Sequence, residues 1–551
     1  MERWQPPLSW YRCGVGLLLA LLLAMGLYGA GGPFVWGHYG YHAGEYSTRA
    51  RHTMRHGTIL PSNAPGFSKP DTASYYLHHP ILTHQLVTLT LLIFGQHEVA
   101  VRAAALISTV ASLLLLVALV RRQWGRWQAL LSGALFVLVP IHVWFAAHID
   151  PGLPGIACLL GFFLCYFPWV EKGRWSLGLL GLCCLMLSGL FEWSPYLAVV
   201  PVGLHALAIG LRRRGRFLAW VPLLAIALLA PVVLHALIVI KTGHIPEMKE
   251  SYLLRSGGPT LWRCLVGLGN GARELFSVPL LISTGVWLLM LVRRAVRRQL
   301  LVRDLLPVSF AFSLVIYAML FRNGVLVHLY RLLYGGVLCA VAAIDFVEAA
   351  ALLAAWWTRR RQPNLIETRV QQRMQRAMIG ATAALIVATL PFSALALASS
   401  RRLGGVPFQR SYEPGLRQRA FVKRMLSLTS PEVPIYVHQS FVIRKDLFFY
   451  TDRDLINAPT LAWVMARPAA ERDRGVLMLI EPVHSPQELA TLTELGRTYP
   501  IWRLGEYTLV DLRRRGIREL HLEKLAPPPP RSLWQRYWEG PYAHPIPIAG
   551  P

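Results

Sequence analysis

Long apolar runs that alternate with short arginine-rich connections are the feature that most constrains the fold of this chain. Basic residues gather on the cytoplasmic side of membrane proteins, and the basic connections here fall on alternate turns. They lie at 121–126 (RRQWGR), 171–174 (EKGR), 211–216 (LRRRGR), 293–298 (RRAVRR) and 356–362 (WWTRRRQ). The pattern predicts about eleven membrane spans, with the N-terminus in the cytoplasm and everything after residue 399 outside.

Composition supports a membrane protein over a soluble one. Of the 551 residues, 54% are hydrophobic and only 15% are charged, which is too apolar for a soluble domain. The net charge of +27 could indicate nucleic acid, but the Lys and Arg residues lie between the apolar runs, so we expect no nucleic-acid partner. The seven cysteines include no CxxC pair, so neither disulfides nor a zinc site is expected.

A long polar loop follows the first span, which we expect over residues 14–31. The loop covers 31–82 and includes YHAGEYSTRARHTMRHG and YYLHHP. The apolar segment after it, 80–95, is too short for an ordinary span and is expected at the membrane interface or as a re-entrant piece. A polar, His-rich loop of this length needs a role beyond connecting two helices, so we predict that it carries chemistry.

Helical spacing places the charged residues of this loop on one face. On a helix that starts near Tyr41, one face carries His42, Glu45, Arg49, His52 and His56. The other face carries Ala43, Tyr46, Ala50 and Met54. The spacing predicts an amphipathic helix at the membrane boundary, with its charged face toward a cavity. The alternative is a helix face that is simply solvated.

The last 150 residues have the composition of a soluble domain. Apolar runs in VPIYVHQSF, GVLMLIEPV and YTLVDL predict strands, and 459–466 and 485–495 predict helices between them. We therefore expect a membrane domain over 1–399 that includes the loop 31–82, an extracytoplasmic α/β domain over 400–525, and a Pro-rich tail over 526–551.

Four places in the chain carry a family likeness. EYSTRARHTMRHG places Tyr46, Ala50, Arg51 and Gly57 in register with a family motif. The segment from YYLHHP to VAVRAAA matches at His79, Pro80, Gly95, Glu98 and Arg102. Asp150 in HIDPG falls on the acidic residue that opens the family's fourth span, and NGVLVHLYRLLY is similar to a late external turn.

These residues resemble the polytopic GT-C glycosyltransferases that use lipid-linked sugars, including protein mannosyltransferase-like enzymes and the aminoarabinose transferases of lipid A. The resemblance covers nearly the whole chain. It implies a mainly α, polytopic membrane helix bundle of the GT-C type with a small extracytoplasmic α/β domain. It also implies transfer of a sugar from a polyprenyl-phosphate donor to an envelope glycan, lipid or protein, with the bacterial cytoplasmic membrane as location.

Site residues follow from the chemistry of that transfer. A carboxylate must remove the proton of the acceptor hydroxyl, and Glu45 and Asp150 are the candidates. Cations must surround the leaving phosphate. The candidates for phosphate or substrate contact are Arg49, Arg51, His79, Lys69, His328, Tyr330 and Arg331. Arg51 could instead be a structural partner, and His328 and Tyr330 could be interfacial anchors.

One departure from the family concerns the catalytic helix. In the alignment, the family's Asp-Glu pair falls on His42 and Ala43, and the nearest carboxylate is Glu45. Three interpretations follow: Glu45 takes over from the same helical face, His42 serves instead, or activity has been lost. No metal is assigned, but a divalent metal held by His42, Glu45 and Asp150 is an alternative.

Two other classes of function stay open. A secondary transporter would show repeats and charges near the bilayer midplane, and neither pattern is visible. A non-catalytic envelope assembly protein would explain the missing Asp-Glu pair. Glu192 in FEWSPY could contact the sugar or support the site from further away, although an interfacial Trp-Tyr belt explains Trp193 and Tyr196 about as well. The pair Asp345 and Glu348, deep in an apolar run, has no assigned role in the mechanism.

Overall fold

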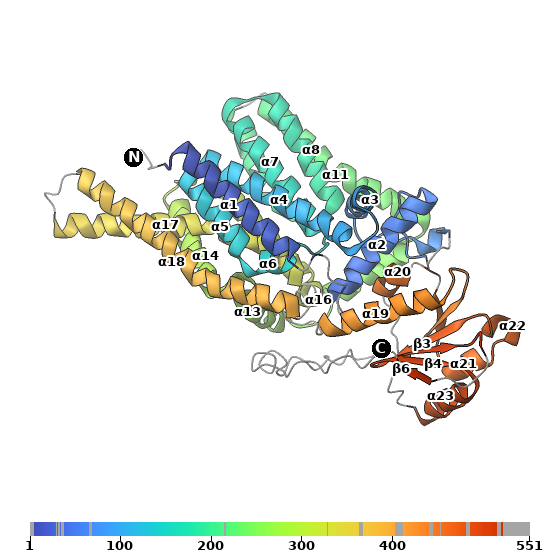
Figure 1. The fold of residues 1–551 in the computed structure, drawn as a ribbon. Helices are drawn as coiled ribbons and strands as arrows, with labels where there is room; N and C mark the ends of the chain where they lie inside the picture. The colour runs from blue at the N-terminus through green and yellow to red at the C-terminus, as the bar shows by residue number, and fades with distance from the viewer. Residues whose placement is uncertain are drawn as a thin grey trace. The chain divides into compact units, whose positions relative to one another are not determined.

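The computed structural model describes residues 5–28, 30, 34, 38–64, 69–213, 216–327, 329–362, 367–402, 412–439, 445–451, 453, 455–480, 485–514 and 519–521. The predicted Pro-rich tail and His328 lie outside the described residues. Many of the helices and strands are labelled in Figure 1.

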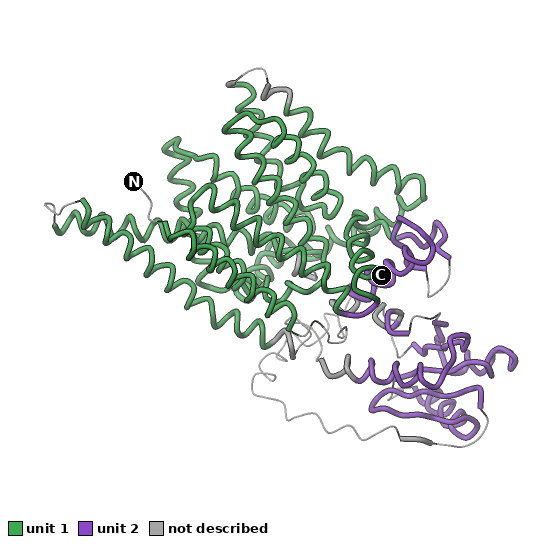
Figure 2. The backbone as a smooth tube through the Cα atoms, turned by 45° about the horizontal axis from the view of Figure 1, so that its top comes forward, with its two compact units in different colours: residues 1–30, 76–95, 99–398 green, residues 31–75, 96–98, 399–551 purple. Residues whose placement is uncertain are grey.

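The chain divides into two compact units, coloured green and purple in Figure 2. Unit 1 comprises residues 1–30, 76–95 and 99–398, and unit 2 comprises residues 31–75, 96–98 and 399–551. Most of the first external loop therefore groups with the C-terminal segment, whereas the sequence-based boundaries placed it with the helices. Those boundaries stay a prediction.

Unit 1 is a bundle of helices. They are α1 (Leu8–Leu27), α3 (Leu82–Phe94), α4 (Glu98–Gln123), α5 (Arg126–Leu138), α6 (Pro140–Phe145), α7 (Gly152–Lys172), α8 (Trp175–Phe191), α9 (Ser194–Ala198), α10 (Val200–Arg213), α11 (Arg216–Thr242), α12 (Ile245–Ser256), α13 (Leu261–Phe276), α14 (Val278–Val296), α15 (Leu305–Leu320), α16 (Arg322–Val327), α17 (Leu333–Arg361) and α18 (Glu367–Arg402). Short 3-10 turns η2 (Val302–Asp304) and η3 (Leu329–Leu332) precede α15 and α17.

The helices of unit 1 are those of a multi-pass membrane protein. Among the described residues, nine helices are long and apolar enough to cross a membrane. Two shorter apolar helices, α5 and α8, would raise the number to the eleven spans expected. The short α3 matches the expectation of a segment too short for an ordinary span. The predicted fold class is therefore confirmed.

A proline separates α5 from α6. Pro140 has no N–H, so the Phe136 carbonyl loses its partner four residues on. His142 Nδ1 lies 2.8 Å from that carbonyl oxygen, which fixes Nδ1 as the protonated nitrogen. His142 therefore restores the backbone hydrogen bond that the proline removes, as a membrane interior requires.

Buried charges join α14, η2 and α17. Arg294 donates to both carboxylate oxygens of Asp345, at 3.2 and 2.7 Å, and lies 3.0 Å from Asp304 Oδ1. Arg303 lies 3.8 Å from Glu348 Oε2. Asp345 and Glu348, which the sequence left without a role, are thus partners of arginines, an arrangement that pins helix registry inside a bundle.

Unit 2 contains a six-stranded sheet in the order β2-β1-β3-β5-β4-β6. Its helices are α2 (His38–His56), α19 (Tyr412–Leu428), α20 (Lys445–Thr451), α21 (Leu461–Met465), α22 (Ala469–Arg472) and α23 (Pro486–Thr498). Its strands are β1 (Ile435–His438), β2 (Leu455–Ala458), β3 (Val476–Ile480), β4 (Ile501–Leu504), β5 (Tyr507–Asp511) and β6 (Glu519–His521). Strand β1 pairs in parallel with β2 and β3, and β5 runs antiparallel to β3 and β4.

Both faces of this sheet are covered, because side chains alternate along each strand. Ile435 and Val437 of β1 join a core with α19 and α20, whereas Tyr436 between them joins a second core with α21 and α23. The three strands and two helices predicted from the sequence are present as β1, β3, β5, α21 and α23. Strands β2, β4 and β6 and helices α19, α20 and α22 were not predicted from the sequence.

Candidate active site

Asp150 lies at the start of α7. Its Oδ1 accepts a hydrogen bond from the Gly152 N–H at 2.7 Å, which caps the helix and fixes the carboxyl group. The residue is 4% exposed. Burial raises the pKa of Asp150 to about 7; the Arg331 charge and the Gly152 N–H oppose this shift, and the Glu192 charge adds to it.

Glu192 and Arg331 form a buried ion pair beside Asp150. Glu192 follows α8 and Arg331 lies in η3, and Arg331 Nη1 donates to Glu192 Oε2 at 2.6 Å. The other carboxylate oxygen accepts from the Trp193 N–H at 3.2 Å and from Ser194 Oγ at 3.4 Å. Both oxygens of Glu192 are therefore already hydrogen bonded.

His79 connects two arginines. Its Nε2 lies 3.1 Å from Arg331 Nη2 and 3.4 Å from Arg255 Nη2, and Arg255 lies in α12. Both guanidinium groups can only donate, so His79 Nε2 accepts and the imidazole is neutral at this nitrogen. Arg331 pairs with Glu192, whereas among the described residues no carboxylate lies within ion-pair distance of Arg255.

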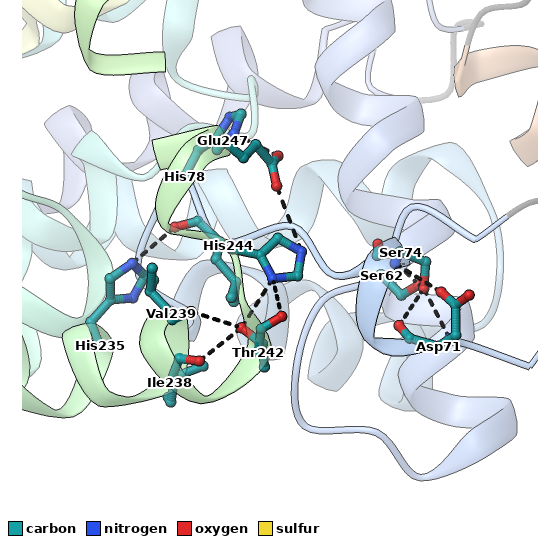
Figure 3. Close-up of polar contacts among 11 residues, drawn as sticks. Ser62, Asp71, Ser74, His78, His235, Ile238, Val239, Thr242, His244 and Glu247 are labelled. Carbon is teal, nitrogen blue, oxygen red and sulfur yellow. Dashed lines mark hydrogen bonds and ion pairs between the residues drawn. The ribbon is translucent and has the colours of Figure 1, made fainter. Parts of the chain in front are cut away.

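The segment that carries His79 is fixed through its backbone. His235 of α11 lies 2.9 Å from the Leu77 carbonyl oxygen, and Trp193 Nε1 donates to the His78 carbonyl at 3.4 Å. His78 Nε2 lies 2.7 Å from Glu247 Oε1. Figure 3 shows Glu247 together with His78, His235 and His244. These contacts hold Leu77 to His79 against α11 and α12.

Helix α12 brings Arg255 to this cluster without a buried anchor of its own. None of its described residues is buried, and glycines in the left-handed region flank it, Gly243 with φ 77° and Gly258 with φ 89°. Only glycine adopts such angles without strain. The helix is held by its polar contacts with His78 and His79, by the hydrogen bond from Asn323 Nδ2 to the Leu254 carbonyl at 2.9 Å, and by packing of Tyr252 against Phe321.

Glu45 belongs to a second cluster, in unit 2. Arg49 Nη2 donates to Glu45 Oε1 at 2.5 Å, and Arg49 Nε donates to Asn63 Oδ1 at 2.9 Å. His42 Nδ1 lies 4.0 Å from Glu45 Oε2. Glu45, Arg49 and His52 are all buried, so this helix face is not simply solvated. The helix begins at His38, three residues before the position predicted.

Arg51 contacts α20 of the same unit. Its Nη1 donates to the Phe449 carbonyl at 2.8 Å, and its guanidinium lies 4.5 Å from the centre of the Phe449 ring. The Phe34 ring lies 4.7 Å from the same ring. These contacts match the alternative that Arg51 is a structural partner, here of α20.

The remaining predicted residues contribute less to either cluster. Lys69 is exposed. The loop around it is closed by an Asp71–Ser74 capping box and a Ser62–Ser74 hydrogen bond, also drawn in Figure 3. Tyr330 lies in η3, but its side chain is not among those described.

Among the described residues, no group of three or more His, Cys, Asp and Glu side chains is placed so that it could hold a metal ion. Of the three residues considered for a metal, His42 and Glu45 lie in unit 2 and Asp150 in unit 1. Sequence reasoning missed Arg255 and gave Glu192 only as a candidate for sugar contact. The only signal for Glu192 was its position at the external end of an apolar run.

The comparisons with known proteins agree with this architecture. A family model described as dolichyl-phosphate-mannose-protein mannosyltransferase matches residues 78–238, a stretch that includes His79, Asp150 and Glu192. The fold is similar to that of crystalline ArnT from Cupriavidus metallidurans in the apo state, with a TM-score of 0.56 over 90% of this chain and 97% of that one, at 13% identity. The chain has the fold of the GT-C glycosyltransferases.

The chain is also similar to a second ArnT structure from Cupriavidus metallidurans, bound to undecaprenyl phosphate, with a TM-score of 0.58 at 14% identity over 90% of this chain and 97% of that one. Among curated proteins, none matches the sequence. The predicted resemblance to GT-C proteins is therefore confirmed at the level of the fold.

Proposed function

We propose that this GT-C protein is an integral-membrane glycosyltransferase that moves a sugar from a polyprenyl-phosphate donor to an acceptor outside the cytoplasm. The observation that carries the proposal is the cluster of Arg255, His79 and Arg331 next to Asp150. Two guanidinium groups beside a carboxyl group suit a reaction in which a phosphate leaves and a hydroxyl loses its proton.

The cationic cluster is the proposed phosphate site. Arg331 Nη1 donates to Glu192 Oε2 at 2.6 Å, and Arg255 contacts His79. Both guanidinium groups are therefore positioned before a ligand arrives. Guanidinium groups bind phosphate oxygens with two parallel hydrogen bonds. The family model, named for a dolichyl-phosphate sugar, and the ArnT structure bound to undecaprenyl phosphate both support a polyprenyl phosphate as the ligand.

Asp150 is the proposed base. As the acceptor oxygen bonds to the anomeric carbon, the bond from that carbon to the phosphate oxygen breaks, and its electron pair stays on the phosphate. Asp150 takes the acceptor's proton, a role that suits a carboxyl group with a pKa of about 7. Glu45 stays the second candidate, although it already accepts a charged hydrogen bond from Arg49.

The setting of the reaction is proposed from the positive-inside pattern. It gives a multi-pass protein of the bacterial cytoplasmic membrane with the N-terminus inside and the C-terminal α/β domain outside. The acceptor would then be an envelope glycan, lipid or protein. The proposal does not name the sugar, and the name of the family model suggests mannose.

Binding of undecaprenyl phosphate to the purified protein tests the phosphate site. Arg255→Ala and Arg331→Ala are expected to weaken binding about tenfold or more each, because each removes a charged hydrogen-bond donor. Arg303→Ala is the matched control, since Arg303 pairs with Glu348 and not with the cluster. Equal binding by all four proteins would refute the assignment.

A further inference from the structure

A buried hydroxyl group in the first turn of α17 has no hydrogen-bond partner among the described residues. It belongs to Tyr334, which is 2% exposed. A buried hydroxyl without a partner lowers stability, and phenylalanine would fill the same space without that cost. The hydroxyl group therefore needs an explanation other than packing.

Its surroundings are the site described above. A Cβ atom at Gly155 of α7 would lie 3.3 Å from the Tyr334 hydroxyl oxygen and 3.2 Å from Glu192 Cβ, so the phenol and Glu192 both lie next to this glycine. Tyr334 also interacts electrostatically with Asp150 and Arg331. The centre of the Tyr334 ring lies 5.7 Å from the centre of the Phe310 ring, and this packing fixes the direction of the Tyr334 side chain.

The charges around the hydroxyl group decide which part of a substrate suits it. An ionised Asp150 would repel a phosphate, and Arg255 with His79 offers a better place for one. A sugar hydroxyl can donate to a carboxylate and accept from the phenol at the same time. The position therefore fits the neutral, hydroxyl-rich part of the donor.

We propose that the Tyr334 hydroxyl, together with Asp150 and Glu192, forms a sugar subsite separate from the phosphate cluster. The subsite rests on the proposed function, because it gives the sugar of the polyprenyl-phosphate donor its place. Tyr334 is a binding residue in this scheme and takes no proton. It makes its hydrogen bond only when the sugar is present.

Tyr334→Phe tests the subsite because it removes only the oxygen atom. We expect it to bind undecaprenyl phosphate as the wild type does, and to lose the additional affinity that the wild type shows for undecaprenyl-phosphate mannose. The kcat/KM of sugar transfer is expected to fall about tenfold or more. The thermal midpoint of unfolding is expected to stay equal or rise, since no hydrogen bond is lost.

Tyr166→Phe is the matched control. Tyr166 is buried in α7, and its hydroxyl group lies 2.8 Å from His205 Nδ1, away from the charged cluster. Its loss removes a hydrogen bond, so the thermal midpoint should fall while transfer stays unchanged. The two variants are therefore expected to show opposite patterns.

Two results would overturn the subsite. One is wild-type transfer and wild-type affinity for the sugar lipid in Tyr334→Phe. The other is a fall in its thermal midpoint as large as that of Tyr166→Phe, which would give the hydroxyl group a structural partner. A wild-type protein that neither binds undecaprenyl phosphate nor transfers sugar would instead refute the proposed function, and the subsite with it.

Discussion

Two buried carboxyl groups at one site have different partners. Glu192 is neutralised by Arg331 at 2.6 Å and uses both oxygens in hydrogen bonds. Among the described residues, Asp150 accepts a hydrogen bond only from the Gly152 N–H, and its pKa is raised to about 7. A protein gives two neighbouring carboxyl groups different roles by placing them in different environments. Glu192 thus positions Arg331, and Asp150 is available for proton transfer.

Sugar transfer should therefore depend on pH through Asp150. Because burial raises its pKa to about 7, the carboxylate form decreases about tenfold for each pH unit below that value. The rate of transfer by the wild type is expected to rise between pH 5.5 and 7 and to level off above pH 8. A rate that does not change over this range would contradict the assignment of Asp150 as base.

Asp150→Asn keeps the size of the side chain and removes its basicity. We expect kcat to fall by about 10² to 10⁴, the usual contribution of a general base, with little change in undecaprenyl phosphate binding. Glu45→Gln serves as the comparison variant. If Glu45→Gln loses transfer and Asp150→Asn keeps it, the catalytic carboxylate is in unit 2.

The sequence identified part of this site for physical reasons. Asp150, His79 and Arg331 stand at the external ends of apolar runs, where topology alone predicts a shared side. Arg255 was not identified because it is one of several arginines between α11 and α14, and its partner His79 is 176 residues away. Tyr334 was not identified because an orphaned hydroxyl group is visible only in three dimensions.

At the level of elements, α2 depends on α20. Arg51 of α2 both donates to the Phe449 carbonyl and lies over its ring, and such cation–π contacts contribute about 0.5–2 kcal/mol. This pairing connects the first external loop with the C-terminal segment inside unit 2. Arg51 belongs to a sequence motif that resembles a substrate-binding pattern, but in the fold its side chain makes a structural contact with α20.

Arg51→Ala distinguishes these two roles. A structural Arg51 predicts a fall of several degrees in the thermal midpoint of unfolding, measured in detergent, because a buried charged hydrogen bond is lost. Arg55→Ala, an exposed arginine of the same helix, should leave the midpoint unchanged. Weaker undecaprenyl phosphate binding at unchanged stability would instead support the phosphate role predicted from the sequence.

The break between α5 and α6 gives a second prediction at this level. His142→Ala leaves the buried Phe136 carbonyl without its partner, which should cost about 1–3 kcal/mol of stability. Pro140→Ala in the same chain should recover part of the loss, since a backbone N–H becomes available again. Thermal unfolding of the single and double variants measures the coupling between His142 and Pro140. Strictly additive changes in stability would argue against this coupling.

At the scale of the whole molecule, the sequence predicted the membrane bundle better than the α/β domain. Spans need about twenty apolar residues, a signal that composition alone reveals. Strands such as β2 and β4 have only four residues each, too few for a periodic pattern. The grouping of residues 31–75 with the C-terminal segment depends on contacts such as Arg51 with Phe449, which no local pattern encodes.

The orientation predicted for the whole molecule can be tested with reporter fusions. A phosphatase that is active only outside the cytoplasm should be active when fused after residue 514, and inactive when fused in the basic connection at 293–298. The physical reason is the placement of arginine-rich connections in the cytoplasm. The reverse pattern would place the candidate site on the cytoplasmic side and contradict an extracytoplasmic acceptor.

The central proposal is that this protein transfers sugar from a polyprenyl-phosphate donor. Purified protein in liposomes should release undecaprenyl phosphate from a radiolabelled undecaprenyl-phosphate sugar when envelope extract supplies acceptors, with mannose and aminoarabinose donors compared. The account predicts release and labelled acceptor with the wild type, and loss of both with Asp150→Asn and Arg331→Ala. No release from either donor, together with no binding of undecaprenyl phosphate, would contradict it.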